Sequence, residues 1–398
     1  MSSRSKMTPL ELRASIGLSG IFGLRLLGMF VILPVFAIYA EQLPGGNDLT
    51  LVGIAIGAYG LTQAILQIPF GWWSDRYGRK PVVYAGLVIF AIGSFIAALA
   101  PNIYIVILGR ILQGAGAISA AVIAMTADLT RESQRAKAMA MIGSTIGASF
   151  ALSLIASPWL SRVIGVPGIF ALTGVLALGA IIVMWRFVPD APELPPAPGR
   201  ALKDFWGVLK DPQLARLNWG IFALHAVLMA LFIMVPFSLR AADLPLVDHW
   251  MVYLPVILGS FVLMLPPIMQ AGEPALLRRW FIAAVAMLLA GHLAFPWLTG
   301  NLWLLSLFLL VFFTPFNVLE AMLPTLTTRL SPAHAKGTAL GVYSSIQFFG
   351  TFVGAAAGGF LYHHWGVSGV IVFDGVLLAI WLILAFGLRV PALPSGRV

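Results

Sequence analysis

The sequence contains no cysteine, and only 10% of its 398 residues carry a charge. Without cysteine, disulfide bonds, thiolate catalysis and cysteine-ligated zinc are excluded. Soluble proteins carry a charge at about a quarter of their positions. Such scarce charge, together with 60% hydrophobic residues, indicates that the chain folds in a membrane rather than in water.

Long apolar runs fill the chain. A bilayer core needs about 20 apolar residues per helical crossing, and runs of that length alternate here with short polar turns. The spans predicted in the first half lie near residues 15–39, 50–73, 81–100, 103–127, 136–160 and 167–188. Those predicted in the second half lie near residues 214–239, 247–270, 279–298, 302–327, 337–362 and 367–388. The expected fold class is therefore all-α integral membrane, with twelve transmembrane helices.

A proline-rich stretch, Pro192–Pro198, separates the two sets of spans. It is followed by Ala201–Leu209, whose pattern predicts a short amphipathic helix on the inner leaflet. We therefore expect an N-terminal six-helix half at residues 1–190, a cytoplasmic linker at 191–212 and a C-terminal six-helix half at 213–398.

An internal repeat supports this division. Thr, Arg, Glu and Ser at 130–133 recur as Thr, Arg, Leu and Ser at 328–331, about half the chain length later, and an Ala-Lys pair follows each set. Duplication of a six-helix unit explains that offset. Because six is even, both halves have the same orientation, as in transporters built from parallel repeats about a pseudo-two-fold axis.

The basic residues indicate the orientation. All but four of the 24 Lys and Arg fall on one set of loops, which the positive-inside rule places in the cytoplasm. Arg25 and Arg110 lie within spans, and Arg162 and Arg240 lie on the opposite loops. We expect a multi-pass protein of the bacterial inner membrane with both termini cytoplasmic. The net charge of +9 then reflects topology, and no nucleic-acid partner is expected.

The most distinctive motif follows the second span, at residues 71–80. Its glycines, Gly71 and Gly78, allow a close helix approach and a tight turn. Its acid, Asp75, is followed by three cations and could exchange partners at the cytoplasmic edge. A plain basic loop would need neither this acid nor these glycines at fixed spacing. The cations are Arg76, Arg79 and Lys80.

This segment resembles the signature loop of the major facilitator superfamily, with every defining position filled. The resemblance implies that Asp75 lies near Lys336 and Gly337 at the start of the eleventh helix in the outward-open state, where the helix dipole favours an anion. It also implies that Asp128 pairs with a loop arginine, most plausibly Arg79. Together these groups would form a cytoplasmic latch that opens as the halves rock.

Further segments resemble the same superfamily. Gly109–Ala117 in the fourth span, which contains Arg110 and Gln113, is similar to a motif of proton-coupled members. The antiporter signature of the fifth helix is only partly present, because Ser157 and Pro158 stand where a Gly-Pro pair is expected. Across both halves the chain resembles YajR-type bacterial transporters, of the drug/proton antiporter type. It ends about ten residues after its last span, so the extra C-terminal soluble domain of some members is expected to be absent.

In the family's arrangement the first, fourth, seventh and tenth helices line the central cavity. Most ionisable residues within the spans fall on those four helices, namely Arg25, Arg110, His225 and Glu320. A charge in hydrocarbon is costly, so these groups should face one another or water. For Arg110, a static arginine satisfied by backbone carbonyls is the alternative to a functional one.

Glu320 is the leading candidate for a proton carrier, because desolvation favours the protonated form of a carboxyl group. Arg25 could anchor an anionic substrate, partner Glu320 in coupling, or form a static ion pair with it. His225 could simply hydrogen-bond a neighbour. Asp374 and His292 are expected to be structural, because they lie near the outer ends of peripheral helices.

Small residues mark expected helix contacts. Gly350, Gly354 and Gly358 recur every four residues on the eleventh span, as Gly143 and Gly147 do on the fifth. Such faces allow close helix crossings.

The leading functional hypothesis is proton-coupled efflux of small, fairly apolar compounds by alternating access. The partners would be a small-molecule substrate, protons and the lipid bilayer, and the protein would be a monomer. Export of sugars or other polar metabolites is the alternative, favoured by amide residues such as Gln113 and Asn317. A membrane enzyme or sensor is a weaker reading. No catalytic residue, metal site or cofactor is expected, because the loops carry no His, Asp and Glu cluster at ligand spacing.

Overall fold

The computed structural model describes residues 6–190, 201–270, 273–332 and 334–390. Within these ranges the chain forms helices and no β-strand. An apolar chain in a bilayer favours this outcome, because a helix satisfies its backbone hydrogen bonds within one segment. The predicted all-α membrane class is confirmed, whereas the proline-rich stretch at 192–198 lies outside the described residues.

The chain divides into two compact units, residues 1–47 with 58–197, and residues 48–57 with 198–398. Helix α3 therefore contributes its first turns to the second unit and the rest to the first. The helices of residues 9–187 are α1 (Pro9–Phe30), α2 (Leu33–Ala40), α3 (Leu49–Tyr77), α4 (Arg79–Ala98), α5 (Ile103–Ala115), α6 (Ser119–Asp128) and α7 (Glu132–Phe187).

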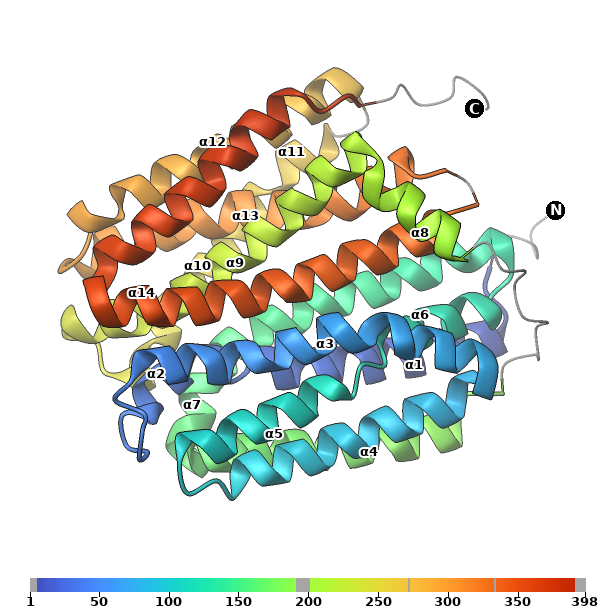
Figure 1. Ribbon diagram of the computed structural model, residues 1–398, viewed down its shortest axis with the longest axis horizontal. Coiled ribbons are helices and arrows are strands. Elements are labelled where there is room, and N and C mark those ends of the chain that lie inside the picture. Colours follow the sequence, from blue (N-terminus) through green and yellow to red (C-terminus); the bar gives the residue numbers. More distant parts are fainter. Residues whose placement is uncertain (1–5, 191–200, 271–272, 333, 391–398) are drawn as a thin grey trace. The chain divides into compact units, whose positions relative to one another are not determined.

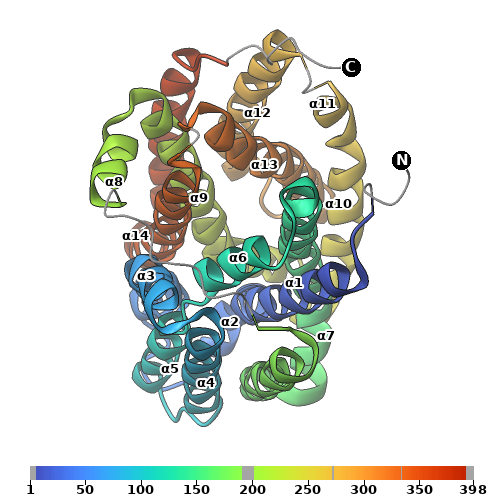
Figure 2. The same cartoon turned by 90° about the vertical axis from the view of Figure 1, so that its right-hand side faces the viewer.

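The remaining helices follow the linker. They are α8 (Ala201–Lys210), α9 (Pro212–Ala241), α10 (Trp250–Leu263), α11 (Leu265–Met269), α12 (Pro274–Ala294), α13 (Leu302–Leu330) and α14 (Lys336–Phe386), with short 3₁₀ turns at Leu246–Asp248 and Phe295–Trp297. Figure 2 views the bundle of α9, α10, α12, α13 and α14 nearly along the helix axes.

Ten stretches among the described residues are long and apolar enough to cross a membrane. Two of them, α7 with 56 residues and α14 with 51, greatly exceed the roughly 20 residues that one crossing needs. Each is interrupted at a single non-helical glycine, Gly165 (φ 68°) in α7 and Gly366 (φ 61°) in α14. If α7 and α14 each cross the membrane twice and the other eight stretches cross it once, the chain makes the twelve predicted crossings. The number of crossings stays a prediction.

Glycines bring α14 against α9 (Figure 1). A Cβ atom at Gly354 would lie 2.0 Å from the Ala226 carbonyl oxygen, and one at Gly350 would lie 2.5 Å from that of Phe222. The two backbones are therefore in direct contact. The expectation for Gly143 and Gly147 is wrong, because no described atom comes within 4 Å of a Cβ atom at either.

Helix α8 is the amphipathic helix that the sequence predicts. Its Val208 is buried in a small apolar cluster with Leu214 and Val342, and Phe205 packs against that cluster. Trp206 on the same helix is 50% exposed. The helix thus packs one apolar side chain into the protein and leaves another outside it, as an interfacial helix would.

Candidate functional site

Two arginines share one tyrosine ring in the first unit. The guanidinium carbon of Arg25 lies 5.6 Å from the ring centroid of Tyr59, and that of Arg110 lies 4.9 Å from it. All three side chains are buried, with at most 3% exposed. The face of an aromatic ring attracts cations, so Tyr59 on α3 lowers the free energy of holding both guanidinium groups away from water.

Each arginine also donates hydrogen bonds to neutral oxygens. Arg25 donates to Ser119 Oγ at 2.7 Å and to Gln63 Oε1, whose amide in turn donates to Gln67. Tyr59, Gln63 and Gln67 are spaced four residues apart, so α3 presents them on one face. This network supplies hydroxyl and amide partners to a buried charge, as such a charge requires.

Arg110 extends the network to α4. It donates to Gln113 Oε1 at 2.9 Å, and the Gln113 amide donates to Ser94 Oγ at 2.8 Å. The break between α5 and α6 lies beside it. There a Cβ atom at Gly114 would come within 2.2 Å of the Tyr59 carbonyl oxygen. The motif of residues 109–117 thus combines a buried charge with a helix contact that only a small residue permits.

In the second unit a carboxyl group, an imidazole and an amide meet. Gln347 Nε2 on α14 lies 2.9 Å from His225 Nε2 on α9 and 3.4 Å from Glu320 Oε1 on α13. Glu320 Oε2 is 3.9 Å from the same ring nitrogen and has no hydrogen-bond partner among the described residues. Two titratable groups are thus close enough to exchange a proton after a small side-chain movement.

The amide sets the tautomer of the imidazole. An amide nitrogen only donates, so His225 Nε2 accepts from Gln347 in this orientation of the amide. The ring hydrogen then lies on Nδ1, which is 3.3 Å from the Ile221 carbonyl oxygen. His225 is therefore a member of the cluster around Glu320 and not an isolated residue. Asn317, one turn before Glu320, donates to Ser260 Oγ on α10 at 2.9 Å.

The motif of residues 71–80, which covers the end of α3 and the start of α4, forms an ion-pair network within the first unit. Arg79 Nε donates to Asp128 Oδ2 at 2.9 Å, which is the pairing that the family resemblance implies. The Arg79 guanidinium also contacts Asp75 and donates to Ser74 Oγ at 2.8 Å. Lys80 pairs with Asp190 at 2.8 Å. The contact of Asp75 with Lys336 and Gly337 stays a prediction.

The glycines and Arg76 complete the loop. Gly78 has φ 91° and separates α3 from α4, a conformation that favours glycine strongly. A Cβ atom at Gly71 would make an ordinary contact with Ala120 at 3.4 Å. Arg76 lies 5.5 Å from the ring centroids of both Trp72 and Tyr77. The turn at Gly78 therefore brings Arg79, at the start of α4, into contact with Asp75, near the end of α3.

The sequence interpretation missed one ion pair, with a buried acid, and one buried contact between an acid and an imidazole. Glu11, in the first turn of α1, accepts from Arg131 Nε at 2.8 Å and from its NH2 group at 2.9 Å. Asp374 on α14 lies 3.6 Å from His292 Nε2 on α12, and both side chains are buried. No local pattern joins residues this far apart in sequence, although an acid inside an apolar run is itself a signal.

Known proteins are similar to this chain in sequence and in fold. Residues 18–355 match the Major Facilitator Superfamily. The inner membrane transport protein YajR of Escherichia coli (strain K12) is 42% identical over 393 residues, which cover 98% of this chain and 86% of that protein. The quinolone resistance protein NorA of Staphylococcus aureus (strain MRSA252) is 27% identical over 206 residues, 51% of this chain and 50% of that protein.

A solved structure has the same fold at low identity. The inward-facing, occupied form of a bacterial homologue of the human lysosomal transporter Spinster gives a TM-score of 0.77 at 14% identity, covering 96% of this chain and 97% of that one. A family match over most of the chain, a close relative along nearly all of it and this fold agree with the buried charges and the loop motif. The chain therefore belongs to the Major Facilitator Superfamily, a family of multi-pass membrane transporters.

Proposed function

We propose that this protein is a proton-coupled exporter of small, fairly apolar compounds that works by alternating access. One observation supports the coupling most strongly. Glu320 Oε2 has no hydrogen-bond partner among the described residues and lies 3.9 Å from His225 Nε2. A partly buried acid, 25% exposed, beside a buried imidazole offers a place where a proton can load and unload.

Aromatic side chains around this cluster favour an apolar substrate. The ring centroid of Phe316 lies 6.1 Å from that of His225, and Phe312 stacks on Phe316 at 5.8 Å. The name of the relative NorA, a quinolone resistance protein, supports export. Sugars or other polar metabolites remain the alternative, supported by the buried amides of Gln63 and Gln67.

The proposed location is the bacterial inner membrane, with both termini in the cytoplasm and the protein as a monomer. The name of the relative YajR supports the membrane, and the distribution of Lys and Arg supports the orientation. Under this topology the ion pairs of Arg79 and Lys80 lie at the cytoplasmic edge, where a latch between the halves would act.

The test begins with a thermal-shift screen of the purified protein against apolar drugs and sugars. Compounds that bind are then followed in proteoliposomes with an imposed pH gradient. We expect uphill movement of an apolar compound in wild type. Glu320→Gln should still bind this compound in the thermal-shift assay but lose uphill movement.

Glu132→Gln is the matched control, because Glu132 is exposed at the start of α7 and carries the same chemical change. It should transport like wild type. Undiminished uphill transport by Glu320→Gln would exclude Glu320 as the proton carrier. If only sugars raise the unfolding temperature in the screen, the substrate is polar and the proposal of an apolar substrate is wrong.

A further inference from the structure

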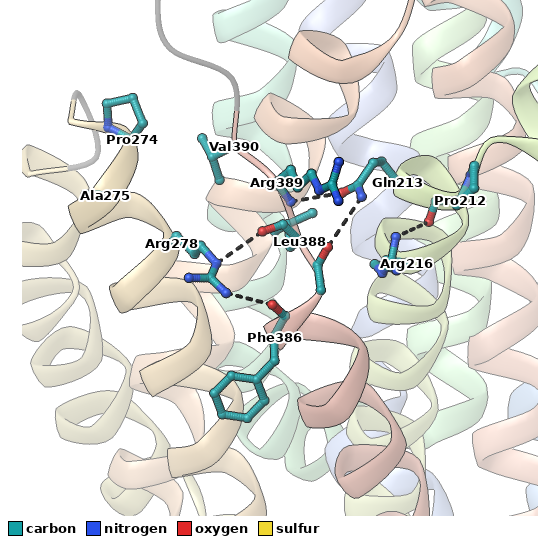
Figure 3. Close-up of a pocket in the computed structure, with 11 residues that line it drawn as sticks. Pro212, Gln213, Arg216, Pro274, Ala275, Arg278, Phe386, Leu388, Arg389 and Val390 are labelled. Carbon is teal, nitrogen blue, oxygen red and sulfur yellow. Dashed lines mark hydrogen bonds between the residues drawn. The ribbon is translucent and has the colours of Figure 1, made fainter.

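A basic pocket lies at the end of the second unit, away from the Glu320 cluster. Its volume is about 800 Å³, and it is lined by the first turns of α9 and α12 and by the chain that leaves α14. Figure 3 shows Arg216, Arg278 and Arg389 gathered around that chain. The pocket thus receives one arginine from α9, one from α12 and one from the chain that follows α14.

No acidic side chain in the lining of this pocket balances its positive charge. No acidic side chain is among the residues that line it, and none of the ion pairs within the described ranges involves the three arginines. Arg278 donates to the carbonyl oxygens of Leu388 and Phe386, at 3.1 and 2.6 Å. Such bonds orient a guanidinium group but leave its full charge in place.

The walls of the pocket are joined by hydrogen bonds of the uncharged Gln213 side chain and by close packing of Arg216. Gln213 donates to the Gly387 carbonyl oxygen at 3.3 Å and accepts from the Arg389 backbone N–H at 2.9 Å. A Cβ atom at Gly387 would lie 2.9 Å from Arg216 Nε, so this guanidinium lies flat against the backbone. Arg216 Nε is buried and has no hydrogen-bond partner among the described residues. An ordinary basic surface would leave such a donor in water.

We propose that this pocket binds the phosphate group of an anionic phospholipid, whose headgroup carries a net negative charge. Guanidinium groups bind phosphate oxygens through paired hydrogen bonds, and basic pockets between transmembrane helices bind anionic lipid headgroups. Apolar surface for an acyl chain lies beside it, since Phe386 lines the pocket and is 59% exposed, and Ile383, one turn earlier, is 72% exposed. The proposed topology places this lipid in the cytoplasmic leaflet, and the binding itself does not depend on that topology.

The same phosphate chemistry could be supplied from solution, so the experiment compares two sources. The full-length chain, purified in a neutral maltoside detergent, is examined by native mass spectrometry. Phosphatidylglycerol, phosphatidylcholine with the same acyl chains, and inorganic phosphate are each added in turn. We expect one phosphatidylglycerol molecule to stay bound per chain at concentrations where phosphatidylcholine and inorganic phosphate do not.

Two variants separate the pocket from a diffuse positive field. Arg216→Gln/Arg389→Gln removes two of the lining charges, and phosphatidylglycerol affinity should fall by about tenfold or more, since each basic residue near an anionic lipid contributes roughly fivefold. Gly387→Leu keeps every charge but fills the hollow. Its backbone angles, φ −84° and ψ 0°, are open to any residue, and binding should fall to a similar extent.

The matched control is Lys210→Gln/Arg279→Gln. It loses the same charge at two exposed positions that do not line the pocket, and it should bind the lipid like wild type. Thermal unfolding of each variant without lipid confirms that it is folded. If inorganic phosphate binds and the variants weaken its binding in the same way, the pocket is a phosphate site, but its ligand is free phosphate and not a lipid. Equal retention of both lipids, or equal loss in the control, would overturn the proposal, and neither result depends on whether the protein exports drugs.

Discussion

Arg79 Nε donates to the Asp128 carboxylate across 2.9 Å, and this bond joins the start of α4 to the end of α6. The same guanidinium contacts Asp75 near the end of α3. The Asp128 side chain is 13% exposed and the Asp75 side chain is 57% exposed. Two acids on one arginine therefore occupy different environments, so their removal should have different effects.

Asp128→Asn should destabilise the protein more than Asp75→Asn does. A hydrogen bond to a charged group contributes about 1.5–3 kcal/mol, whereas an exposed ion pair contributes at most about 1 kcal/mol. Thermal unfolding in detergent measures the difference. Equal unfolding temperatures for the two variants would contradict the assignment of Asp128 as the group that positions Arg79.

Asp75→Asn should instead alter access to the cytoplasmic side of the cavity. Loss of the carboxylate would weaken the proposed outward-open latch, so the inward-open state would become more populated. Because the chain has no cysteine, Thr325→Cys provides a single thiol, at an exposed position near the end of α13, the tenth span, which the family's arrangement places on the cavity. A membrane-impermeant maleimide added to inverted vesicles should label this thiol faster in the Asp75→Asn background. An unchanged rate, matching that in a Glu132→Gln background, would count against the latch.

Tyr59 should matter through its ring and not through its hydroxyl group. The hydroxyl group has no hydrogen-bond partner among the described residues, whereas the ring faces both Arg25 and Arg110. Tyr59→Phe should therefore leave stability unchanged or raise it, because it removes a buried polar group that has no partner in the described part of the chain. Tyr59→Leu should destabilise by about 2 kcal/mol or more, the upper range for desolvated cation–π contacts. Thermal unfolding tests this order, and a larger effect of Tyr59→Phe would reverse the interpretation.

Gly354→Ala should destabilise the second unit. The added methyl group would lie 2.0 Å from the Ala226 carbonyl oxygen, so α9 and α14 would have to separate, at a cost of about 1–3 kcal/mol. Gly143→Ala is the control, because nothing described lies within 4 Å of the new atom. There the higher helix propensity of alanine should leave stability unchanged or raise it by about 1 kcal/mol. Equal yields and unfolding temperatures would exclude backbone contact at Gly354.

His292 and Asp374 should be coupled energetically. Their facing atoms are 3.6 Å apart, and neither carboxylate oxygen has a hydrogen-bond partner among the described residues. His292→Phe or Asp374→Leu alone leaves a buried polar group unpaired, which costs about 1–3 kcal/mol. The double variant should therefore be less destabilised than the sum of the two single variants. Simple additivity in a thermal-unfolding cycle would show that the two side chains act independently.

The sequence predicts the elements of this fold better than their contacts. Apolar run length and charge placement are local, so the spans and α8 lie within a few residues of their expected positions. The Arg79 to Asp128 pair was accessible only through resemblance to a family. The place of Gln347 between His225 and Glu320 was not accessible at all, because three helices distant in sequence must first pack together.

His292 and Asp374 illustrate the limit more sharply. The sequence indicates only that both are structural residues near helix ends, and their juxtaposition depends on which faces of α12 and α14 meet. An apolar helix in lipid has no polar face to indicate this rotation. Packing of small and aromatic side chains decides it instead, and that information is spread over both helices.

The single-glycine breaks at Gly165 and Gly366 also determine where the chain can be modified. At each break the helix resumes after one residue, so there is no loop into which an epitope, a protease site or a fluorescent protein could be inserted. Such insertions usually succeed in exposed loops. Reporters of topology should therefore be attached at the chain ends, and antibodies raised against the intact protein should find few continuous epitopes at these two breaks.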